Sequence, residues 1–135
     1  MALANDLMGL GESGKLASRL ANGGTGPVSI TAAGTTAATA TQIYGTQFVV
    51  YVNATAGVQG VQFTAPGGDN GALIYDDFVV HNGYTSSIYI YAPTGVTINV
   101  GGAGYTSALP FTLATLKTLT VYTGPTQTQW FGLSA

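Results

Sequence analysis

Residues 88–100 read Ile-Tyr-Ile-Tyr-Ala-Pro-Thr-Gly-Val-Thr-Ile-Asn-Val, and this stretch decides the fold class. Isoleucines alternate with tyrosines up to position 91, a Pro-Thr-Gly turn follows, and valine and isoleucine then alternate with threonine and asparagine. A period of two places successive side chains on opposite faces of a β-strand. Glycine and proline between such runs mark turns. The stretch therefore predicts two short strands joined by a turn.

The same alternation extends from Pro27 to the end of the chain. Its apolar positions are Val28, Ile30, Phe48, Val50, Val52, Val61, Phe63, Ile88, Ile90, Val96, Ile98, Val100, Phe111, Leu113, Leu119, Val121, Trp130, Phe131 and Leu133. Gly/Pro-rich turns separate about eight to ten short strands, without a solenoid repeat of fixed period. We predict that residues 25–135 form one all-β domain, an antiparallel β-sandwich or jelly-roll-like barrel.

The first 24 residues follow a different pattern. Their leucines recur at helical spacings of three and four, and glycines interrupt the pattern, which predicts two short helical pieces. Helices this short are marginal in isolation, so their apolar faces must be buried on a partner subunit, on the surface of a larger assembly or on the β domain of the same chain. The candidate interface residues are Leu3, Leu7, Leu10, Leu16 and Leu20.

Charged residues make up only 6% of the chain, against about 25% in a typical soluble domain. With 46% hydrophobic residues and a net charge of −2, the chain is predicted to fold. A surface with so few charges does little to keep copies apart. We interpret it as a surface that is covered in an assembly or that works at high local copy number.

The composition also argues against several classes of partner. The chain has no basic patch for a nucleic-acid backbone and no run of 18 apolar residues for a membrane span. It has no cysteine for a disulfide or a thiolate metal site. Its start lacks the pattern of a signal peptide, so we expect a protein made in a cytoplasm and kept there or released by lysis.

Motifs that suggest catalysis or cofactor binding are weak. Residues 9–15, Gly-Leu-Gly-Glu-Ser-Gly-Lys, approach a phosphate-binding loop, but no buried strand precedes them and Leu16 replaces the required hydroxyl residue. His81 is the only histidine and is interpreted as a rim or hydrogen-bonded core residue. We therefore expect no enzyme activity, no catalytic residue and no cofactor.

Three aspartates raise a metal site as an alternative. Asp69, Asp76 and Asp77 are the only acids after residue 12 and could offer oxygen ligands to Ca²⁺. Neighbouring strand residues point to opposite faces, however, so Asp76 and Asp77 are not expected to converge. The simpler interpretation is turn chemistry at Asp69 and hydrogen-bonded strand carboxylates at the other two positions.

The tyrosines offer a further alternative. A tyrosine combines an apolar ring with a polar tip and suits sugar binding, although strand packing explains most of these residues equally well. The eight are Tyr44, Tyr51, Tyr75, Tyr84, Tyr89, Tyr91, Tyr105 and Tyr122.

Several stretches together resemble small proteins encoded among the virion genes of tailed bacteriophages. They are the start Met-Ala-Leu-Ala-Asn-Asp-Leu-Met-Gly-Leu-Gly, the Thr/Ala-rich residues 30–41, residues 88–99, and the closing segments around Phe111, Leu119 and Gln129-Trp130. The family usually continues its opening with Met-Pro, where this chain has Glu12-Ser13.

The resemblance implies a phage head protein, that is, a decoration, cement or head-fibre subunit that binds the major capsid protein and is often a homotrimer. It implies localisation in the virion after assembly in the bacterial cytoplasm, and it transfers no catalytic residue. The alternative is a tail-fibre or receptor- and glycan-recognition module that uses tyrosines on loops.

Overall fold

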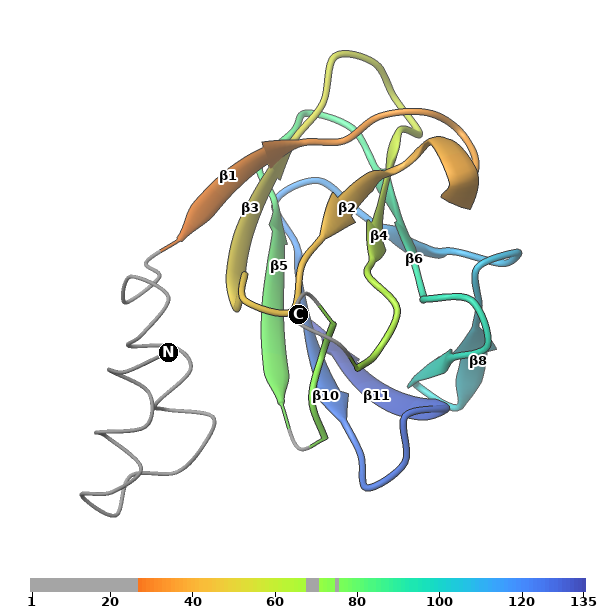
Figure 1. The fold of residues 1–135 in the computed structure, drawn as a ribbon. Coiled ribbons are helices and arrows are strands. Elements are labelled where there is room, and N and C mark those ends of the chain that lie inside the picture. Colours follow the sequence, from red (N-terminus) through yellow and green to blue (C-terminus); the bar gives the residue numbers. More distant parts are fainter. Residues whose placement is uncertain (1–26, 68–70, 75) are drawn as a thin grey trace, which may run out of the picture.

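A computed structural model describes residues 27–67, 71–74 and 76–135 (Figure 1). The predicted helical segment 1–24, its five leucines and Asp69 lie outside these residues. The elements in chain order are β1 (Val28–Thr31), the 3₁₀ helix η1 (Ala37–Thr39), β2 (Thr41–Ile43), β3 (Val49–Asn53), β4 (Gly60–Phe63), β5 (Asp77–Asn82), β6 (Ile88–Tyr91), β7 (Thr97–Val100), β8 (Ala103–Tyr105), β9 (Phe111–Leu113), β10 (Thr118–Thr123) and β11 (Gln129–Ser134).

The strands form two sheets that pack face to face as a sandwich. The larger sheet has seven strands in the order β1-β3-β5-β10-β11-β7-β8, and the smaller has four in the order β2-β4-β6-β9. In Figure 1, β3, β5, β10 and β11 lie in one layer and β2, β4 and β6 in the other. The prediction of an all-β sandwich is confirmed, although the described residues contain eleven strands and not eight to ten.

The prediction of an antiparallel sandwich or jelly-roll-like barrel is wrong, because both sheets are mixed. From β1 to β6 the chain alternates between the sheets, so β1, β3 and β5 run parallel in one sheet and β2, β4 and β6 run parallel in the other. A parallel pair needs a crossover connection, and here a strand of the opposite sheet supplies it. Alternation along a strand is the same in both arrangements, so it does not reveal strand direction.

Every antiparallel pair of described strands includes β8, β9 or β10, whereas β7 and β11 run parallel. β10 lies between β5 and β11 and runs antiparallel to both, and the pairs β6–β9 and β7–β8 are also antiparallel. The β7–β8 hairpin turns at Gly101-Gly102, whose φ angles of 59° and 86° fit a type I′ turn. The stretch 88–100, by contrast, places β6 in the small sheet and β7 in the large one.

An aromatic cluster fills the space between the sheets. The rings of Phe48 and Phe78 stack with centroids 5.5 Å apart, and Phe63 from the small sheet lies 5.5 Å from Phe78 and 5.7 Å from Trp130. Phe78 and Trp130 are almost completely buried. Aliphatic residues at the alternating positions of the other strands surround this cluster and complete the core.

A buried asparagine fastens the connection between the sheets. The Asn82 side-chain amide donates to the carbonyls of Ser86 and Leu113, at 2.9 and 3.0 Å, and its oxygen accepts from the Tyr84 amide at 2.9 Å. The loop that leaves β5 is thereby joined to β9 of the small sheet. These three hydrogen bonds satisfy the Asn82 side-chain amide, so its burial in the core carries little energetic penalty.

Phe78→Ala should lower the free energy of unfolding by about 3–5 kcal/mol, because it removes stacked aromatic surface and leaves a cavity between the sheets. Leu116→Ala is the matched control: Leu116 is 70% exposed, so its loss should change stability by no more than about 0.5 kcal/mol. Urea unfolding followed by tryptophan fluorescence measures both. Equal effects of the two substitutions would contradict the assigned core.

Candidate binding surfaces

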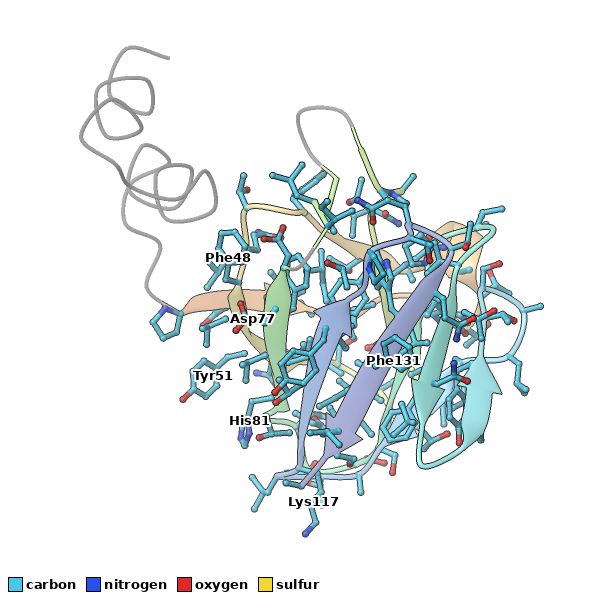
Figure 2. The ribbon with its side chains drawn as sticks, turned by 90° about the horizontal axis from the view of Figure 1, so that it is seen from below. Phe48, Tyr51, Asp77, His81, Lys117 and Phe131 are labelled. Atoms are coloured by element: carbon cyan, nitrogen blue, oxygen red, sulfur yellow. The ribbon has the colours of Figure 1, made fainter. Side chains whose placement is uncertain are left out.

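The outward side of the seven-stranded sheet carries large apolar side chains. We call it the outer face and define it by six residues: Val49, Tyr51, Val79, Tyr122, Phe131 and Leu133. Strand register makes them neighbours, because Val49 pairs with Val79, Tyr122 with Phe131, and Thr120 with both Val79 and Leu133. Figure 2 shows Tyr51 and Phe131 on the strands of this sheet.

Several apolar side chains of the outer face are largely exposed to solvent. Tyr51 is 47% exposed, Phe131 49% and Leu133 65%. Scattered exposed apolar residues are ordinary, whereas a contiguous patch marks an interaction site. The outer face is therefore the first candidate for a contact with another molecule.

Two titratable residues of β5, Asp77 and His81, flank the outer-face residue Val79. The His81 ring lies 5.3 Å from the Tyr51 ring, and its Nδ1 is 3.0 Å from the Thr118 hydroxyl oxygen. The residue is half-buried, which fits the predicted rim histidine with a hydrogen-bond partner. It belongs to the border of the outer face.

Asp76 and Asp77 point to opposite sides, as the alternation predicted. Asp76 is buried and accepts a hydrogen bond from the Leu73 amide at 2.9 Å, whereas Asp77 lies on the outward side of β5. The hydroxyl of Thr123 accepts from the Asp76 amide at 2.7 Å. Asp76 thus serves the local structure before β5. Within residues 27–67, 71–74 and 76–135, no three His, Cys, Asp or Glu side chains form a group that could hold a metal ion.

A second surface lies over the four-stranded sheet. It is an open cleft of about 450 Å³, which we call the tyrosine cleft. Tyr89 and Tyr91 of β6 and Thr112 of β9 line it on the sheet, and residues 35–37 and 107–110 line it from two loops. No lysine, arginine, aspartate, glutamate or histidine is among these lining residues.

Tyr91 is locked in place at the cleft. A Cβ atom at Gly60 would lie only 2.5 Å from the Tyr91 ring, so the ring occupies the space that the glycine leaves. The Tyr91 hydroxyl donates to the Thr35 carbonyl at 2.9 Å and so fastens one wall to the sheet. Burial raises the pKa of Tyr91, and the neighbouring Tyr89 raises it further.

Both tyrosines are evident in the sequence, but the cleft is not, because its walls lie far from β6 along the chain. The outer face was also missed, although the pair Trp130-Phe131 carries its signal: adjacent strand residues cannot both face inward. The predicted interface leucines lie outside the described residues. Among the residues that are described, no helix has the length and apolarity needed to span a membrane.

The free energy of unfolding should fall as the pH rises above 10, in part because the Tyr91 hydroxyl ionises. Its pKa is raised above the ordinary value of 10.0, so the folded state retains this proton more strongly than the unfolded state does. Stability linked to the group is therefore complete below pH 10 and is lost as the pH rises toward the folded pKa. Above pH 10, Tyr91→Phe should show a shallower decline of the free energy of unfolding than the wild type. Parallel declines in the two proteins would contradict this assignment.

Comparison of the chain with protein-family models, with curated proteins and with solved structures finds no match in any of the three.

Proposed function

We propose that this chain is a structural protein of a phage virion, which decorates or cements the outer capsid surface and associates with copies of itself. The observation that carries the proposal is the outer face, an exposed apolar surface on the larger sheet. The capsid as partner and the homotrimer as oligomer come from the sequence resemblance.

The outer face has the chemistry of a surface that is buried in an assembly. Tyrosine and phenylalanine are enriched in protein interfaces, where charged residues are depleted from the centre. Fully burying a side chain such as Phe131 contributes roughly 1.5–3 kcal/mol. Lys117 is the only lysine or arginine after position 19, and it lies in the turn before β10. Little charge repulsion therefore opposes the approach of a second copy.

β1 is the first strand of the large sheet, and its Ser29 pairs with the outer-face residue Tyr51 on β3. Residues 1–24 precede this strand in the sequence. We propose that the outer face mediates contacts between copies, and that Leu3, Leu7, Leu10, Leu16 and Leu20 attach the assembly to the capsid.

Phe131→Glu should convert the homotrimer to monomers, because burying a carboxylate in an apolar contact is strongly unfavourable. The control is Thr94→Glu, which adds the same charge at an exposed turn position before β7. Size-exclusion chromatography with light scattering gives the oligomeric state of both variants and of the wild type. A wild-type protein that is monomeric at micromolar concentration, or a Phe131→Glu variant that stays trimeric, would refute the role of the outer face.

Deletion of residues 1–24 should abolish binding to capsids and leave the β domain folded, because the described core is built from later residues. Circular dichroism tests folding, and co-sedimentation with capsids lacking this protein tests attachment. A Leu3→Ala, Leu7→Ala, Leu10→Ala triple variant separates the loss of apolar contacts from the loss of chain length. Capsid binding by the deletion variant equal to that of the intact chain would contradict the attachment role.

A further inference from the structure

We propose that the tyrosine cleft is a binding site for an uncharged carbohydrate. The proposal does not depend on assembly through the outer face, because the two surfaces lie on different sheets. It rests on the shape of the cleft, on its two tyrosine rings, on its hydroxyl groups and on the absence of charge among its lining residues.

The half-buried Tyr89 ring supplies an apolar surface with a polar tip, and the buried Tyr91 ring packs against it. Tyr89 and Tyr91 meet edge to face, with centroids 6.2 Å apart and an interplanar angle of 82°. Both line the cleft, but Tyr91 is only 3% exposed, so the half-buried Tyr89 offers the accessible ring. Sugar rings present faces of C–H groups that pack on aromatic rings, while their hydroxyls reach polar atoms at the ring edge. Tyrosine suits both contacts.

The hydroxyl groups of the cleft match those of a sugar. Among the described residues, the side chains of Thr35, Ser107, Thr112 and Tyr89 form no hydrogen bond with another residue, whereas the Tyr91 hydroxyl is bound to Thr35. A hydroxyl both donates and accepts, and so does each hydroxyl of a saccharide. A nucleotide, a phosphorylated ligand or a charged peptide would find no opposite charge among the lining residues.

The walls of the cleft are held in place before any ligand arrives. The bond from Tyr91 holds residue 35, and a side-chain hydrogen bond of 3.0 Å between Thr36 and Thr39 shapes the same loop. In the other wall, the Thr106 hydroxyl accepts from the amides of Ala108 and Leu109 at 3.2 and 3.1 Å. A site that is already ordered loses little conformational entropy on binding. Its volume of about 450 Å³ lies in the range of small-molecule sites.

The test uses a panel of neutral trisaccharides built from glucose, galactose, mannose or N-acetylglucosamine. Saturation-transfer NMR and calorimetry on the full chain should detect at least one of them with a millimolar or lower Kd. Tyr89→Ala should weaken that binding by at least about tenfold, and Thr112→Val, which removes a hydroxyl with little change of shape, should weaken it by a smaller factor. Tyr44→Ala is the control, because Tyr44 is exposed and does not line the cleft.

Three results would overturn the proposal: no saturable binding of any panel member up to about 10 mM, equal binding by wild type and by folded Tyr89→Ala, or tighter binding of a sialylated than of the matching neutral saccharide. Circular dichroism establishes that each variant is folded. The Phe131→Glu protein separates this proposal from the assembly role, because it should bind the saccharide with unchanged Kd. Loss of trimers with retained sugar binding supports both proposals, and sugar binding without any trimer supports the cleft alone.

Discussion

The packing of Phe78 against its aromatic neighbours is the interaction on which the rest of the structure depends. Phe78 belongs to the large sheet and Phe63 to the small one, and Trp130 completes the contact from β11. Aromatic pairs favour a limited set of geometries, so the cluster fixes both the spacing of the sheets and the side that each strand turns inward. Once Trp130 faces the core, Phe131 must face outward, and the apolar outer face follows from the packing of the interior.

Alternation along a strand also produces the second surface, which lies over the small sheet. Ile88 and Ile90 of β6 are buried in the core, so the tyrosines between and after them turn away from it. Tyr91 then packs over Gly60, where a larger residue would collide with its ring. Each sheet therefore presents aromatic side chains on its outer side, but the large sheet leaves them exposed, whereas the small sheet holds them between two loops.

Alternation in the sequence was sufficient to predict a β-sandwich and most of its core, because burial on a strand follows a period of two. It did not predict strand direction. The Gly/Pro-rich turns were interpreted as links in an antiparallel fold, yet the connections at Gly57 and at Asn82-Gly83 each run from one sheet to the other. The tyrosine cleft joins residues 35–37 to residues 107–110, and no local pattern relates segments so distant in sequence. Trp130-Phe131 did carry a local signal, since one of the two had to be exposed.

The scarcity of charge sets how the two surfaces can act. Asp76 is buried with hydrogen-bonded partners, which leaves Asp77 and Lys117 as the residues of unambiguous charge on the described surface. The proposed contacts at the outer face would depend mainly on apolar burial, with Asp77 beside Tyr122 as the one described acid there, so salt should affect them little because screening acts on charges. Without electrostatic steering, association rate constants are about 10⁵–10⁶ M⁻¹s⁻¹. Such rates are adequate where copies are concentrated on a shared lattice, and this is the setting in which a nearly uncharged decorating subunit is at no disadvantage.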